Sequence, residues 1–101
     1  DRQRRTAERY LRGRGVPLDR VRWVLAKTDS VWLRDYGPNF VYGDGDWGVV
    51  DFHYYDQRPR DDDTPLEVAA AEGKRVIDRQ QGALRVYTEG GNLNTDGLGG
   101  L

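Results

Sequence analysis

The sequence predicts an α/β or α+β fold in which a small sheet is faced by helices. Helical periodicity and β-rich runs alternate along the chain in the order helix, three strands, helix, strand. An Asp-Gly pair between two β-rich runs is typical of a hairpin, and a Thr-Pro-Leu-Glu sequence is typical of a helix start. The length of 101 residues allows one domain at most.

The first part of the chain is expected to hold a helix and a strand. Residues 2–12 place Ala7, Tyr10 and Leu11 at helical spacing among charged side chains, and glycines follow at once. The run 21–26 is largely apolar, which is typical of a partly buried strand.

A hairpin is expected next, with strands at 39–42 and 47–55 joined by Gly-Asp-Gly-Asp. The two aspartates of this turn could suggest a calcium loop. Tyr55, however, stands where such a loop needs a bidentate glutamate, so we expect no metal here.

A second helix is expected to begin at Thr64, which can cap it together with Glu67. Its apolar stripe continues to Ile77, with a weak point at Gly73. The negative charges of the acidic run 61–63 would interact favourably with the positive, N-terminal end of the helix dipole.

The chain is then expected to finish with a strand at 83–88 and a glycine-rich loop at 89–100. The density of glycines suggests that the backbone of this loop approaches another group closely. The loop lacks the spacing and the Lys-Ser/Thr ending of a phosphate-binding loop.

Composition argues against several classes of function. The net charge of −1 gives no bulk attraction to nucleic acid or to a membrane surface, and no apolar run is long enough to span a bilayer. The arginine-rich face of the first helix could be a binding surface, although a solvated face fits this charge better. Without cysteine there is no disulfide, thiolate metal site or thiol nucleophile.

The cellular compartment is only weakly constrained by the sequence, with the cytoplasm favoured. The lack of methionine and the end at Gly-Leu-Gly-Gly-Leu suggest an excerpt of a longer protein.

The stretch around which the chain is organised is 31–38, Val-Trp-Leu-Arg-Asp-Tyr-Gly-Pro. Gly-Pro breaks regular structure, so Asp35 is expected at the end of an element that aims its carboxylate into a cleft. A carboxylate suits a guanidinium ligand because its two oxygens match two parallel N–H donors. Asp35 could instead pair internally with Arg34 or cap a turn.

Three stretches together resemble the guanidine-deiminating family that includes bacterial peptidylarginine deiminases and agmatine deiminases. They are 31–38, the run 50–65 that begins Val-Asp-Phe-His-Tyr-Tyr, and the run 89–99 that begins Glu-Gly-Gly-Asn. They occur in the family's order and extend the resemblance over roughly residues 21–100.

The resemblance implies a pentein-like fold, a five-bladed propeller of ββαβ units, of which this chain would supply about one to one and a half blades. Residues 1–101 would then be the N-terminal portion of a deiminase catalytic domain, and its partner would be the remainder of that domain. The parent would be a hydrolase acting on C–N bonds of linear amidines, with no metal or cofactor. It would turn peptidyl-arginine into citrulline, or agmatine into carbamoylputrescine, through a Cys-thiouronium intermediate.

The resemblance also implies roles for individual residues. Asp35 matches the first guanidinium-binding carboxylate and is the one catalytic residue expected here. Trp32 matches an aromatic residue of the substrate channel, where a ring can pack on the alkyl arm or the guanidinium. The residues matching a loop that shapes the site are Gly90, Gly91, Asn92 and Asp96. For Asn92 and Asp96, shaping the glycine turns is the more ordinary reading.

Arg58 and Arg60 match an Arg-Pro-Arg that holds the carboxylate end of the substrate in the peptidyl-type enzymes. The match needs one extra residue before Arg58. If it holds, it argues against agmatine, which has no carboxylate. The other interpretation is that both arginines pair with Asp56 and the acidic run 61–63 at the surface.

The departures from the family are large. Its His-x-Asp pair and its nucleophilic cysteine lie downstream of the glycine loop, and neither occurs here. His53, the one histidine, lies in mid-strand and is expected to be structural. The chain by itself is therefore expected to be inactive. The alternatives are a non-catalytic remnant that binds arginine or agmatine, and a purely structural fragment.

Overall fold

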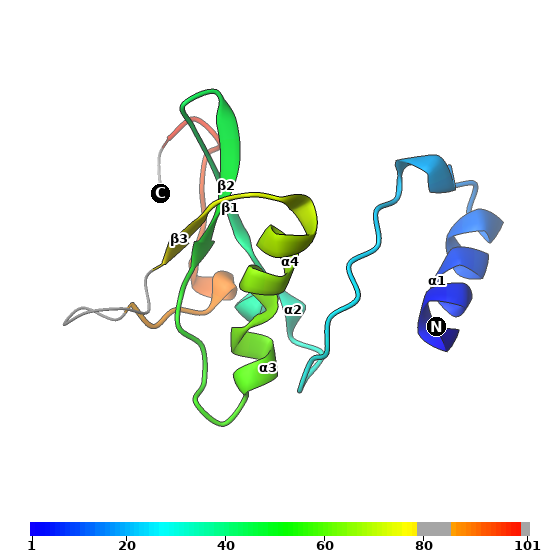
Figure 1. The fold of residues 1–101 in the computed structure, drawn as a ribbon, viewed down its shortest axis with the longest axis horizontal. Helices are drawn as coiled ribbons and strands as arrows, with labels where there is room; N and C mark the ends of the chain where they lie inside the picture. The colour runs from blue at the N-terminus through cyan, green and yellow to red at the C-terminus, as the bar shows by residue number, and fades with distance from the viewer. Residues whose placement is uncertain (79–85, 100–101) are drawn as a thin grey trace.

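The computed structural model describes residues 1–78 and 86–99, which form a mixed α+β structure (Figure 1). This confirms the predicted mixture of helices and strands. Its elements are α1 (Arg2–Gly13), η1 (Leu18–Arg20), α2 (Leu33–Tyr36), β1 (Asn39–Gly43), β2 (Asp46–Asp51), α3 (Pro59–Asp62), α4 (Thr64–Glu72), β3 (Val76–Asp78) and η2 (Gly90–Asn92).

The sheet has the order β1-β2-β3. β1 and β2 form the expected antiparallel hairpin, with Phe40 opposite Val49, and β3 lies parallel to β2. The hairpin turn consists of Asp44 and Gly45, whose φ angles of 54° and 78° are both positive. A two-residue turn of this kind matches the twist of the two strands. Because α3 and α4 connect β2 to β3, the central unit has the order ββααβ.

The core lies where α4 and the β2–α3 connection meet the sheet and α2. Its buried apolar side chains are Tyr36, Val49, Tyr54 and Ala69. The rings of Tyr36 and Tyr54 are 5.6 Å apart, so this aromatic pair ties α2 to the connection between β2 and α3.

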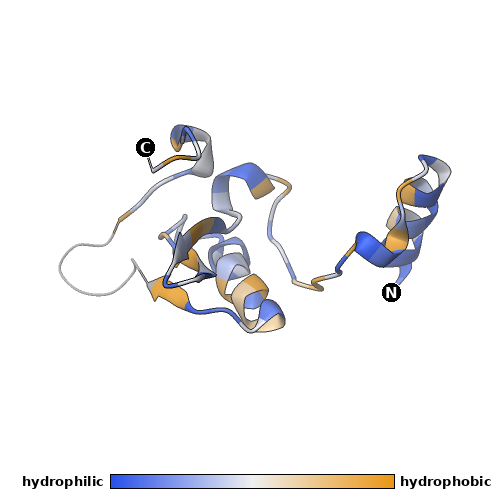
Figure 2. Cartoon of the chain, turned by 90° about the horizontal axis from the view of Figure 1, so that it is seen from above, coloured by the Kyte–Doolittle hydropathy of each residue, from blue (hydrophilic) through white to orange (hydrophobic). Residues whose placement is uncertain are grey.

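The helix α1 stands apart from the sheet, at the end of a long extended segment (Figure 1). It is mostly hydrophilic with a strip of apolar residues (Figure 2). Asp1 caps the helix by accepting a hydrogen bond from the amide of Gln3 at 2.7 Å, and the guanidinium of Arg4 lies over the ring of Trp23. The radius of gyration is 15.2 Å, compared with about 13 Å for a compact domain of this length. The helix predicted at 2–12 is confirmed.

The prediction of a strand at residues 21–26 is wrong. These residues are extended, but among the described residues no strand pairs with them. An apolar run becomes a strand only when its backbone is hydrogen-bonded to a neighbouring strand. Here, side-chain contacts hold the segment instead. One of them is Arg22, which forms an ion pair with Glu72 of α4.

The second strand of the hairpin was expected to reach Tyr55, but β2 ends at Asp51. His53 then forms an isolated parallel bridge with Tyr87. Tyr87 belongs to the strand expected at 83–88, of which residues 83–85 lie outside the described part of the chain.

The helix predicted to continue to Ile77 ends at Glu72, because Gly73 adopts the left-handed conformation with φ 62°. The weak point at Gly73 is thus confirmed, while Val76 and Ile77 belong to a strand and not to the helix.

Thr64 is not the helix cap that we expected. Its hydroxyl donates to the carbonyl of Arg60 at 3.1 Å, and Asp63 occupies the cap position without a side-chain hydrogen bond. The short helix α3 directly precedes α4, so the backbone is already helical where α4 begins. None of the helices in residues 1–78 and 86–99 has the length and apolar character needed to cross a bilayer.

Candidate functional site

Asp35 lies in the last turn of α2 and lines a pocket at the edge of the core. The helix ends at Gly37, whose amide donates to the carbonyl of Leu33 at 2.8 Å. This confirms that Asp35 lies at the end of an element. The pocket is lined by Asp35, Tyr36, Gly37, Asn39, Val50, Phe52, Tyr54, Pro65 and Thr88.

The glycine-rich loop packs directly on α2. A Cβ atom at Gly90 would lie 2.1 Å from the carbonyl oxygen of Arg34, and one at Gly91 would lie 3.1 Å from Oδ1 of Asp35. Nη2 of Arg34 donates to the carbonyl of Leu93 at 3.2 Å. Arg34 therefore bonds to the loop and not to the neighbouring carboxylate of Asp35, and only glycine allows the loop to come this close.

A buried carboxylate holds the segment that precedes α2. The side chain of Asp61 is fully buried. It accepts hydrogen bonds from the amides of Asp29 and Ser30, at 2.7 and 3.2 Å, and from the hydroxyl of Ser30 at 2.6 Å. Burial acts to raise the pKa of Asp61, but these hydrogen bonds outweigh it and leave the pKa below its ordinary value. The carboxylate is therefore ionised at neutral pH.

The same segment is held from its other side by Tyr36, whose hydroxyl donates to the carbonyl of Ser30 at 2.9 Å. Burial, followed by the negative charge of Asp61, raises the pKa of Tyr36. Asp61 thus takes part in positioning α2, which differs from the helix-dipole role expected for the run 61–63. Asp62 also departs from that role, since its Oδ1 accepts the amide of Tyr54 at 2.6 Å.

Trp32 occupies the cap position before α2, and its side chain is 57% exposed. It precedes Asp35 by one helical turn but does not line the pocket. The ring therefore stands at the surface beside the pocket.

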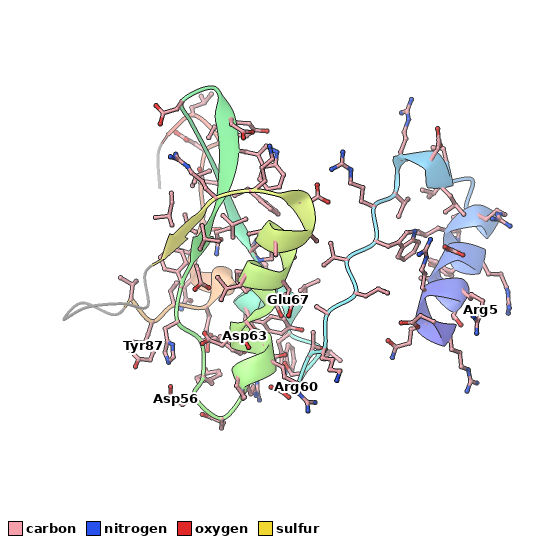
Figure 3. The ribbon with its side chains drawn as sticks, in the orientation of Figure 1. Arg5, Asp56, Arg60, Asp63, Glu67 and Tyr87 are labelled. Atoms are coloured by element: carbon pink, nitrogen blue, oxygen red, sulfur yellow. The ribbon has the colours of Figure 1, made fainter. Side chains whose placement is uncertain are left out.

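Arg58 and Arg60 have different surroundings. The guanidinium of Arg58 lies 5.5 Å from the ring centroid of Tyr55, and its Nη1 donates to the hydroxyl of Tyr54 at 3.3 Å. Arg60 projects from α3 toward the segment before α2 (Figure 3), where its amide donates to Asp29 at 2.9 Å and its Nε lies 3.8 Å from the same carboxylate. The surface pairing partner of Arg60 is therefore Asp29 and not Asp56 or the acidic run 61–63.

The polar residues of the glycine-rich loop shape its turns. The backbone amide of Asn92 donates to the carbonyl of Glu89 at 2.8 Å in the short helix η2, and the side chain of Asp96 accepts a hydrogen bond from the backbone amide of Leu98 at 2.8 Å. Both side chains are exposed. Of the expected loop residues, the structure brings Gly90 and Gly91 to Asp35.

His53 is buried beside the start of α3. Its Nε2 is 2.7 Å from Oδ1 of Asp56, and its Nδ1 is 3.5 Å from Oδ2 of Asp62. The ring meets Tyr87 edge-on at 4.4 Å, and Asp56 and Tyr87 lie at the same end of the molecule (Figure 3). These contacts agree with a structural role. Groups of three or more metal-type ligands are absent from the described ranges.

Sequence reasoning missed Ser30, and it named Glu89 only as the first residue of the matching loop, without a role of its own. Ser30 gave no signal, because its partner Asp61 lies 31 positions away. The Glu89 carboxylate accepts a hydrogen bond from the hydroxyl of Tyr55. Its place directly before two glycines was a signal that this loop is fixed at its start.

Comparison with known proteins places the chain in a family. The model of the Porphyromonas-type peptidyl-arginine deiminase family matches residues 1–101. An agmatine deiminase from Stutzerimonas stutzeri is 33% identical over 108 aligned residues, which cover 95% of this chain and 28% of that protein. A putative agmatine deiminase 1 from Listeria monocytogenes is 32% identical, again over 95% of this chain and 28% of that protein. An agmatine deiminase from Ectopseudomonas mendocina is 36% identical over 82% of this chain and 24% of that protein. The chain thus spans about a quarter of these relatives, and it belongs to the Porphyromonas-type peptidyl-arginine deiminase family.

Proposed function

We propose that this chain is part of the catalytic domain of a guanidine deiminase, a hydrolase acting on the C–N bonds of linear amidines. Asp35 binds the substrate guanidinium, and Trp32 packs on the alkyl arm or the guanidinium plane. Membership of the family supports this proposal, as do the names of the relatives, which are agmatine deiminases.

One observation carries the assignment of Asp35. The backbone of Gly90 and Gly91 packs against Arg34 and Asp35 so closely that a Cβ at either glycine would press on them. The loop backbone lies against the carboxylate of Asp35 at the edge of a pocket, while the neighbouring Arg34 is bonded to the loop. A carboxylate held in this way can accept two parallel N–H bonds from a planar guanidinium.

The proposed reaction attacks the central carbon of the guanidinium. A cysteine thiolate forms a C–S bond to this carbon, and one C–N bond breaks as ammonia leaves with a proton from a general acid. Water then attacks the thiouronium carbon, the C–S bond breaks, and the ureido product and the thiolate are released. The role of Asp35 is to hold the cation and fix its plane throughout.

The chain itself contains no cysteine. Its histidine, His53, is buried against two carboxylates. We therefore assign the nucleophile and the His-x-Asp pair to a part of the polypeptide outside these residues, and expect the 101-residue chain alone to be inactive. The relatives, which are three to four times longer, leave room for that part. The central unit consists of a hairpin, a helical connection and a third strand. This arrangement is compatible with one ββαβ blade of the five-bladed propeller that we propose for the whole domain.

Substitution of Asp35 by Asn tests the proposal in the complete enzyme. We expect kcat/KM for agmatine and for peptidyl-arginine to fall by more than a hundredfold, because a charge partner is lost in a desolvated site. Asp19→Asn, at an exposed aspartate of η1, is the matched control. Activity of Asp35→Asn within twofold of the wild type would overturn the assignment.

A second candidate is a non-catalytic module that binds arginine or agmatine. The absence of a thiol in the chain favours it, because a guanidinium bound by the carboxylate of Asp35 would not be turned over without a nucleophile. Calorimetric titration of the 101-residue chain with agmatine distinguishes the two. Saturable binding that Asp35→Asn abolishes would support the module, while heats equal to dilution would remove it.

A further inference from the structure

The helix α1 carries a stripe of exposed arginines along one face. Its members recur every three or four positions, and residues with this spacing lie one above the other on a helix. They are Arg2, Arg5, Arg9 and Arg12. Within residues 1–78 and 86–99, no ion pair joins their side chains to another residue. This arginine stripe is therefore a set of cations that the described chain does not neutralise.

The opposite face of α1 is the one that packs. There Arg4 forms an ion pair with Glu8 at 2.8 Å, and its guanidinium lies over the ring of Trp23. Ala7 and Glu8 of this face are half-buried. The arginine stripe does not hold α1 in place, and Figure 3 shows Arg5 on the side of the helix that faces away from the sheet.

The net charge of −1 conceals a separation of charge along the chain. Residues 1–22 contain eight arginines and three acidic residues, whereas residues 23–101 contain eight basic and fourteen acidic residues. The two parts thus carry net charges of +5 and −6. A polyanion such as nucleic acid would be attracted by the first part and repelled by the second, whereas a second copy of this chain offers a complementary charge to both.

The acidic counterpart of the stripe lies on α4. Asp63 and Glu67 are exposed, and their spacing of four positions places them on one face. Neither forms an ion pair with another residue of the described ranges. Arg5 and Arg9 have the same spacing of four, so the two helices present pairs of opposite charge one helical turn apart. Within one chain these pairs stay apart, because the extended segment lies between α1 and α4 (Figure 1).

We propose that α1 of one copy docks on the exposed face of α4 of a second copy, reciprocally, to form a two-fold symmetric dimer. Arg5 and Arg9 lie opposite the carboxylates of Asp63 and Glu67. Single surface ion pairs contribute little, but the symmetry repeats each pair. Leu66, which is 39% exposed on the same face of α4, is covered by the alkyl stems of the arginines.

The first test follows the association of the complete enzyme by sedimentation velocity. We expect a dimer whose Kd rises at least about tenfold between about 20 mM and about 500 mM salt, because exposed ion pairs are screened. The double variant Arg5→Glu/Arg9→Glu should raise Kd about as much at low salt. The matched control is Arg20→Glu/Lys27→Glu, which changes the net charge equally at exposed positions outside the stripe and should leave Kd within about threefold.

The decisive test exchanges the charges between two variants. Asp63→Arg/Glu67→Arg should weaken self-association as Arg5→Glu/Arg9→Glu does, because each variant then faces like charge. A mixture of the two variants places opposite charges together again, so we expect a 1:1 complex with Kd near the wild-type value in native mass spectrometry. Circular dichroism checks that both variants keep their helices, and Arg5→Gln/Arg9→Gln replaces a variant that does not.

Three results would overturn the proposal. One is a monomeric wild type at low salt, which would leave the stripe to another part of the polypeptide or to solvent. The others are variants that associate as the wild type does, and a mixture that fails to associate. None of these results bears on Asp35, whose role is judged by catalytic activity.

Discussion

The hydroxyl of Ser30 donates to the buried carboxylate of Asp61 across 2.6 Å, and this contact joins α3 to the segment that leads into α2. Asp29 adds two further hydrogen bonds between the same two segments, one as a donor and one as an acceptor. Its amide donates to Asp61, and its carboxylate accepts the amide of Arg60. The position of Asp35 therefore depends on residues outside its own motif.

Replacing Asp61 by Ala should destabilise the chain by about 3 kcal/mol, because the buried carboxylate is lost and the donor groups of Asp29 and Ser30 no longer have an acceptor. Urea unfolding followed by tryptophan fluorescence measures the change. Asp63→Ala, at an exposed neighbour without a side-chain cap bond, is the control and should shift the unfolding free energy by less than about 0.5 kcal/mol. Equal effects of the two substitutions would contradict the role of Asp61.

The same carboxylate predicts a dependence of stability on pH. Its native pKa lies below the ordinary value of 3.8, so its contribution is fully present above that pH and is lost as the pH falls through the native pKa. The difference in Tm between wild type and Asp61→Asn should be constant from neutral pH to about pH 5 and should narrow on further acidification. A difference that stays constant down to about pH 2 would show that the pKa of Asp61 is not lowered by folding.

Gly90→Ala should disturb α2, since its Cβ would lie 2.1 Å from a backbone oxygen of Arg34. Backbone atoms cannot move aside as a flexible side chain can, so we expect a loss of about 1–3 kcal/mol. Gly13→Ala, where a Cβ meets nothing within 4 Å, serves as the control and should be neutral or slightly stabilising. Thermal unfolding of both variants makes the comparison, and a neutral Gly90→Ala would mean that the loop does not pack as described.

Tyr36→Phe should cost about 1 kcal/mol, because it removes a hydrogen bond to the carbonyl of Ser30 in a nearly buried setting. The ring contact with Tyr54 is kept. Tyr10→Phe on the exposed surface of α1 provides the reference. Hydrogen exchange offers a second readout, since the amides of Asp29 and Ser30 should exchange faster only in Tyr36→Phe.

Local chemistry explains which elements could be predicted from the sequence. The hairpin follows from Asp44 and Gly45, because the turn itself requires positive φ angles that these residues accept. The end of α4 follows from Gly73 in the same way. The helix α1 follows from periodicity over a dozen residues. In each case neighbours in the sequence decide the conformation.

The remaining features depend on partners that are distant in the sequence. The run 21–26 has strand composition, but a strand exists only beside another strand. Val76 and Ile77 continue an apolar helical pattern, yet the left-handed turn at Gly73 directs them into the sheet beside β2. Within the site, the position of Asp35 in its motif was predictable, while its support by Gly90 and the contact of Ser30 with Asp61 were not, because tertiary packing alone creates them.

The parallel pairing of β2 with β3 implies an order of folding events. The β1–β2 hairpin closes through a two-residue turn, an event of microseconds in other chains. The β2–β3 ladder, by contrast, must bring Val49 beside Val76 across the intervening α3 and α4, and such non-local closure is slower. We therefore expect the amides shared by β1 and β2 to gain protection first in a pulse-labelling experiment, before the amide of Val49, which donates to the carbonyl of Arg75.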